Sequence, residues 1–119
     1  MLEQQLCDLV ELAIRQTERR KLHWEAIDDE TFRAVIGIGA LRIHANVEQI
    51  GDVTHEFLSS PYYELWVMNL KGQVVESVRA REGANQYDIL DKLFVTARKA
   101  ALDGHIIIDQ MMAALYASG

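Results

Sequence analysis

The sequence predicts one α+β domain, with an N-terminal helix, a mainly antiparallel five-stranded sheet and two C-terminal helices packed on one face of that sheet. Three observations support this prediction. Apolar residues recur at helical spacing towards both ends of the chain. In the middle they alternate with polar residues, and turn sequences divide this part into hairpins. The length of 119 residues suits one domain, so we assign residues 1–119 to a single unit.

Composition narrows the class of protein. Hydrophobic residues form 50% of the chain and charged residues 25%, which is typical of a globular domain and excludes a disordered chain. The net charge of −6 disfavours binding to nucleic acid or to an anionic membrane. Cys7 is the only cysteine, which rules out a disulfide within the chain. The N-terminus has no signal-peptide pattern and the apolar runs are short, so we expect a cytoplasmic protein.

Residues 2–19 are predicted to form the N-terminal helix. Acidic residues lie early in this segment and basic residues late, an order that suits the helix dipole. Glu11 and Arg15 are spaced as a pair on one helix face. The apolar face follows helical spacing through Leu2, Leu6, Leu9, Val10, Ala13 and Ile14.

Two hairpins are predicted next, over residues 21–37 and 36–46. In the first, a turn at 28–30 places Glu25 opposite Arg33 as a cross-strand charge pair. In the second, the sequence favours a two-residue turn made by a glycine and its neighbour. With that turn at Ile38-Gly39, the apolar pairs are Ile36 with Leu41, Ala34 with Ile43 and Phe32 with Ala45.

A third hairpin is predicted over residues 62–79. Its turn, Asn69-Leu70-Lys71-Gly72, ends on a glycine that can take the left-handed conformation. Both faces of this hairpin are rich in apolar residues. We orient Leu65, Val67 and Val75 towards the core, because the opposite choice would bury two glutamates.

The C-terminal part is predicted to form two helices. The first spans 85–102, with Asn85 as its cap and Gly104 just after its end. The second spans 105–117, where apolar residues hold helical spacing. Its run of isoleucines also suits a strand, so the sequence leaves open whether 105–108 is helix or strand.

Two apparent motifs are excluded. Gly37-Ile38-Gly39 begins like a dinucleotide-binding loop, but the third glycine is missing and a strand is expected next, so we interpret it as a hairpin turn. His55-Glu56 begins like a zinc protease motif, but Ser59 stands where the second histidine is required. We therefore predict no catalytic residue, no metal site and no cofactor.

An acidic segment, residues 47–61, contains no lysine or arginine. The sequence leaves open whether it is a loop or holds a short amphipathic helix. We interpret its polar side as a solvated face, with a site for a cation or a basic partner as the alternative. The candidate residues of this acidic loop are Glu48, Asp52, His55 and Glu56.

Two further surfaces are candidates for binding. The first is a polar sheet face, interpreted as ordinary solvent-facing charge pairs, with a small-ligand or anion site as the alternative. Its residues are His23, Arg33, Arg42 and His44. The second is an apolar stripe, which either is covered within the domain or forms an interface, most simply that of a two-fold homodimer. Its residues are Trp66, Met68, Val74 and Val78.

The chain resembles a group of small uncharacterised bacterial α+β proteins. The resemblance rests on residues 22–25, 32–34, 63–67, 69–76, 87–94 and 97–102, which are mostly core and turn residues. That group has no established activity, so the resemblance implies no catalytic residue. The acidic charge and the order of elements also resemble the small dimeric chaperones of bacterial type III secretion, which implies a helix near 52–58 and a partner protein.

We therefore predict a non-enzymatic protein-interaction module that forms a homodimer or binds another protein. One alternative is an acidic secretion-type chaperone. The other is a small-ligand or anion binder that uses the polar sheet face.

Overall fold

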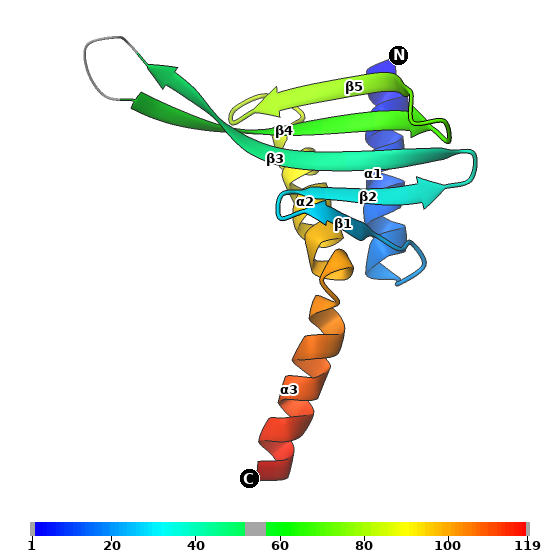
Figure 1. Cartoon of the computed structure of the whole chain (residues 1–119), viewed down its shortest axis with the longest axis vertical. Helices are drawn as coiled ribbons and strands as arrows, with labels where there is room; N and C mark the ends of the chain where they lie inside the picture. The colour runs from blue at the N-terminus through cyan, green and yellow to red at the C-terminus, as the bar shows by residue number, and fades with distance from the viewer. Residues whose placement is uncertain (1, 52–56, 119) are drawn as a thin grey trace.

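The computed structural model describes residues 2–51 and 57–118 and confirms the α+β fold class. The strands are antiparallel and lie in the spatial order β1-β2-β3-β4-β5 (Figure 1). The elements are α1 (Leu2–Glu18), β1 (Glu25–Asp28), β2 (Thr31–Ile36), β3 (Gly39–Gly51), β4 (Phe57–Asn69), β5 (Val74–Arg81), α2 (Tyr87–Ala101) and α3 (Gly104–Ser118).

The elements form two layers. α1 and α2 lie side by side on one face of the sheet (Figure 1). α2 contacts all five strands, and the buried faces of both helices close one hydrophobic core over the sheet. α3 continues from the end of α2 away from this body, and it is joined to the layer through its contact with α2 (Figure 1). The opposite face of the sheet, which we call the outer face, has no helix over it in the described ranges.

Trp24 holds α1 against the start of the sheet. Its side chain is 1% exposed, and its indole N–H donates to Thr17 Oγ1 at 2.8 Å. The Thr17 hydroxyl in turn donates to the Ala13 carbonyl at 2.6 Å. Both polar groups are buried, so these bonds remove the cost of desolvating them.

The first hairpin is shorter than predicted. β1 begins at Glu25, so residues 21–24 lie outside the strand, although the predicted pair of Glu25 with Arg33 is confirmed. The register then shifts, and Asp28 faces Thr31. Asp28 Oδ1 accepts the Glu30 N–H at 2.8 Å, and this backbone bond is the main reason that the pKa of Asp28 is lowered. The aspartate therefore sets the turn, which the strand pattern alone did not reveal.

The predicted register of the second hairpin is wrong by two residues. Ile36 faces Gly39, which makes Gly37-Ile38 the two-residue turn. Gly37 has a φ of +57°, as the first turn position requires, and a Cβ on Gly39 would lie 2.8 Å from the Met68 carbonyl oxygen. Gly39 is thus needed for the close approach of β4. An even shift keeps every side chain on its face, so the predicted inward residues of β2 and β3 pack in the core, except Ile36, which lies beside α1 and is exposed.

The third hairpin contains a bulge that changes its inward residues. The turn at Asn69 is confirmed, and the Asn69 N–H donates to the Gln73 carbonyl at 3.0 Å. The register shifts between Val67 and Met68, which leaves Val75 62% exposed and brings Val78 to the core side. Val75 therefore lies on the predicted side of the sheet, beside Leu6 and Leu9, but it is not buried there as predicted.

Residues 47–51 and 57–61, the described parts of the segment 47–61, are strand. β3 continues to Gly51 and β4 begins at Phe57, and the two strands stay paired up to these residues. They extend beyond the ends of β2 and β5 as a two-stranded ribbon (Figure 1). Pro61 fits there because its carbonyl accepts the Glu82 N–H at the β5 side, so its missing N–H costs no bond to β3.

The C-terminal segment 105–117 is helical, as predicted, and lies within α3. Asn85 is not the cap of the preceding helix: α2 begins at Tyr87, and Gln86 precedes it without a side-chain cap bond. Asp103, with a φ of +54°, separates the two helices. The ribbon and α3 give a Cα radius of gyration of 17.0 Å, above the about 13–14 Å of a compact domain of this length.

Candidate functional site

The outer face of the sheet joins two surfaces that the sequence predicted separately. β3 and β4 pair so that Arg42 faces Trp66 and His44 faces Glu64. The polar sheet face and the apolar stripe are therefore neighbours on one surface. On this face, paired residues of β2, β3, β4 and β5 form three rows across the sheet. The rows are Val35, Ala40, Met68 and Val74; then Arg33, Arg42, Trp66 and Ser77; then Thr31, His44, Glu64 and Arg79.

Trp66 is the centre of this face. The Arg42 guanidinium lies 5.5 Å from the ring centroid of Trp66, and the His44 ring lies 6.0 Å away on another side. A hydrogen bond of 2.7 Å between Thr31 Oγ1 and His44 Nδ1 orients the imidazole. Trp66, Arg42 and His44 are all half-buried, so neighbouring side chains hold the indole in place.

Charged groups surround this centre. Arg33 forms an ion pair with Glu25 at 3.0 Å, and the guanidinium of Arg79 lies 4.0 Å from the ring centroid of Tyr62. Arg42 Nε is buried and has no hydrogen-bond partner among the residues that the structure describes. Two arginines of this face, Arg42 and Arg79, therefore lie against aromatic rings. They do so in a chain whose net charge is −6.

Two predicted residues do not belong to this face. His23 lies in the connection before β1 and lines a cavity with Trp24, Ala100 and Asp103 near the ends of α1 and α2. Val78 packs against the core on the opposite side, because the bulge in β5 reverses its direction. The candidate face therefore keeps Arg33, Arg42 and His44 from one prediction and Trp66, Met68 and Val74 from the other.

The predicted acidic loop is only partly described. Glu48 lies in β3, opposite Ser60. Asp52, His55 and Glu56 lie outside the described residues. A helix over 52–58 is wrong at its end, because Phe57 and Leu58 belong to β4.

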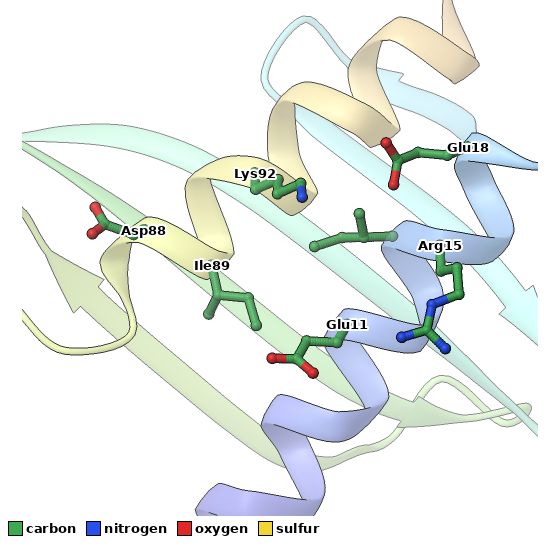
Figure 2. A pocket seen from close by; sticks show the side chains of 7 residues that line it. Glu11, Arg15, Glu18, Asp88, Ile89 and Lys92 are labelled. Carbon is green, nitrogen blue, oxygen red and sulfur yellow. The ribbon is translucent and has the colours of Figure 1, made fainter.

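An open groove of about 490 Å³ lies between α1 and α2 (Figure 2). Glu11, Arg15 and Glu18 border it from α1, and Asp88 and Lys92 border it from α2. Carboxylates and cations alternate along its walls, so it concentrates neither charge. The groove arises from the packing of two helices and holds none of the candidate residues that the sequence predicted.

Tyr63 and Asp91 form a polar contact on the helix-covered face. The Tyr63 hydroxyl donates to Asp91 Oδ1, and the ring packs at a tilt against Tyr87 and Phe94, at centroid distances of 5.2 and 5.3 Å. Burial, followed by the bond to Asp91, raises the pKa of Tyr63 above its ordinary value. A phenol with a raised pKa stays protonated at neutral pH, so this contact stabilises the packing of α2 on β4.

We expect this contact to make the protein less stable in alkali. The phenol of the unfolded chain loses its proton near pH 10, whereas the raised pKa keeps Tyr63 protonated in the folded state. The stabilisation is therefore present below about pH 10 and is lost as the pH rises above it. Urea unfolding at about pH 8 and about pH 10.5 should show a smaller alkaline loss for Tyr63→Phe than for the unchanged chain. Tyr87 is present in both proteins, so the difference between their losses reports Tyr63. Equal losses in the two proteins would contradict the role of Tyr63.

No group of three His, Cys, Asp or Glu side chains in the described part of the chain is placed to hold a metal ion. Cys7 is half-buried on α1. No helix described in the structure is long and apolar enough to cross a membrane.

No family model, no curated protein and no solved structure matches this chain. The resemblances to the bacterial group and to the secretion chaperones therefore remain predictions.

Proposed function

We propose that this chain is a non-enzymatic cytoplasmic protein-interaction module, a homodimer that binds a partner protein on the outer face of its sheet. The observation that carries the proposal is the Trp66 centre. It places an indole, a guanidinium and an imidazole together on a sheet face with no described helix over it. Tryptophan and arginine are the side chains most often found where interfaces gain their binding energy.

The surroundings of Trp66 support the same function. A row of apolar side chains through Ala40, Met68 and Val74 borders the indole on one side. The row through His44, Glu64 and Arg79 borders it on the other. An apolar centre beside a polar rim is the usual composition of a protein interface.

A small-anion site on the same face is the second candidate. It is favoured by Arg42, whose Nε has no hydrogen-bond partner among the described residues. An anion that drew this side chain outward would supply the missing acceptor. Titration with inorganic phosphate, followed by Trp66 fluorescence, distinguishes this site from a protein interface.

We expect loss of the Trp66 centre to weaken partner binding without unfolding the domain. Trp66→Ala and Arg42→Ala should each reduce the amount of partner captured from the native host by about 30-fold, the size of a hot-spot effect. Lys71→Ala, at the exposed turn after β4, is the control and should capture as well as the unchanged chain. Circular dichroism and the urea midpoint confirm that each variant is folded. Undiminished capture by both face variants would reject the proposal.

A further inference from the structure

α3 presents an apolar face that nothing in the described chain covers. Between residues 106 and 118 every side chain is exposed, including Leu115 at 71% and Tyr116 at 79%. The large apolar residues form two adjacent rows, Ile107, Met111 and Leu115 beside Ile108, Met112 and Tyr116, which cover about half of the helix circumference. A helix of 15 residues is marginally stable by itself in water, so this face needs a surface to pack on.

The structure offers a matching apolar groove on α1. One flank of α1 packs beside α2, and the opposite flank forms a groove over the end of the sheet. Leu9 belongs to two adjoining hollows, of about 220 and 300 Å³, which together follow α1 from Gln5 to Gln16. The walls are mainly Leu6, Leu9, Leu12, Leu22, Ile36 and Val75.

The groove and the helix have the same length. From Gln5 to Gln16 α1 rises about 17 Å, and from Ile106 to Tyr116 α3 rises about 15 Å. A face half a circumference wide is broader than the seam of a two-stranded coiled coil. It suits a groove with two walls, which α1 and the sheet provide.

α3 does not lie in this groove of its own chain. It continues from the end of α2 away from the body, and its contact within the described ranges is with α2 (Figure 1). Asp103, just before α3, lines a cavity with Lys21 and Leu22, so the Lys21 end of the groove lies near the point where α3 begins. A second copy can fill the groove while each α3 keeps the direction it has in the structure.

We propose that α3 of each molecule docks in the α1 groove of a second copy, which produces a reciprocal two-fold dimer. The inference rests on the homodimer in the proposed function and leaves the outer face of the sheet free for the partner protein. Lys21 lies at one end of the groove and Glu76 at the other, and Asp109 is the one acidic residue of α3. Placing Asp109 towards Lys21 makes α3 antiparallel to α1, the arrangement that also pairs opposite helix dipoles.

The buried area is sufficient for a stable dimer. The six apolar residues of the two rows together expose the equivalent of about three and a half whole side chains, each worth about 100 Å² of apolar area. Two reciprocal contacts, counted on both sides, would bury about 1,400 Å², within the range of a standard protein interface. A membrane surface fits less well, because the sequence has no lysine or arginine after Lys99 to meet anionic lipids.

The test is the oligomeric state of the full chain by sedimentation equilibrium. We expect the unchanged protein to be a dimer, and Leu115→Glu on α3 and Leu12→Glu on the groove to weaken the dimer at least about a hundredfold. Val74→Glu on the outer face is the matched control, an equally exposed valine that should leave the dimer intact. Circular dichroism checks that each variant remains folded.

Mixing the two variants identifies the contact. Leu115→Glu keeps an unchanged groove, and Leu12→Glu keeps an unchanged α3. An equimolar mixture therefore regenerates one α3–groove contact and should associate more tightly than either variant alone. A Leu12→Glu protein that remains dimeric, or a mixture that gains no association, overturns the exchange. Binding of the unchanged protein to phosphatidylglycerol vesicles that is lost in Leu115→Glu also overturns it.

The outcomes separate this inference from the proposed function. A dimer broken by Val74→Glu but not by Leu115→Glu would reject the α3 exchange and leave a homodimer formed through the outer face. A monomeric unchanged protein would reject the exchange and the homodimer together, and capture of a partner through Trp66 would still be decided by its own test.

Discussion

Replacing Trp24 with alanine is expected to lower the free energy of unfolding by about 3–5 kcal/mol. The side chain is 1% exposed and fills the space between α1 and the start of the sheet. Its removal leaves a cavity and takes away the donor at 2.8 Å from Thr17 Oγ1. Domains of this size are stable by about 5–15 kcal/mol, so the loss is a large part of the total.

Trp24→Phe is the matched control. It keeps an aromatic ring and removes the indole N–H, while Thr17 still donates to the Ala13 carbonyl at 2.6 Å. We expect a smaller loss of about 1–2 kcal/mol, the cost of one buried hydrogen bond and some packing. Urea unfolding followed by far-ultraviolet circular dichroism gives both values. Equal losses in the two variants would mean that the ring volume contributes little and that the hydrogen bond dominates.

Periodicity alone was sufficient to predict the elements and the inward faces of β2 and β3. The partners of their residues were predicted less well, because Gly37-Ile38-Gly39 offers two glycines to one turn. The choice depends on β4, whose Met68 carbonyl leaves no room for a Cβ at Gly39. This contact joins residues far apart in sequence, so local turn preferences do not contain it.

The candidate site shows the same limit. Three of the four residues of the polar sheet face and three of the four residues of the apolar stripe lie on the outer face. Their union around Trp66 depends on the register of β3 with β4 across the acidic segment, which no short motif specifies. The one misplaced stripe residue, Val78, follows a bulge, and a single extra residue reverses every side chain after it.

The position of α3 was beyond sequence reasoning for a different reason. Its apolar residues predict a helix that must be covered, and burial within the same chain is the simplest assumption. In the structure α3 points away from the body (Figure 1), and the apolar groove described on α1 does not hold it. A strong apolar pattern thus indicates that a face is buried without saying in which molecule its partner lies.

Replacing Leu93 with alanine is expected to cost about 3–5 kcal/mol, the second large effect. Leu93 is 0% exposed on the face of α2 that packs on the sheet. α2 contacts all five strands, so a cavity beneath it weakens the contact between the two layers of the fold. The cost combines the lost transfer of the side chain from water with the empty volume that rigid neighbours cannot fill.

Val95→Ala tests whether this loss comes from burial. Val95 lies two residues further along the same helix and is 56% exposed. Alanine favours the helix more than valine does, so we expect a change within about 0.5 kcal/mol of zero. Urea unfolding of both variants, at a protein concentration that keeps the oligomeric state the same, isolates the packing of α2. Similar losses at the two positions would contradict the docking of α2 through its Leu93 face, because the two side chains differ mainly in their exposure to water.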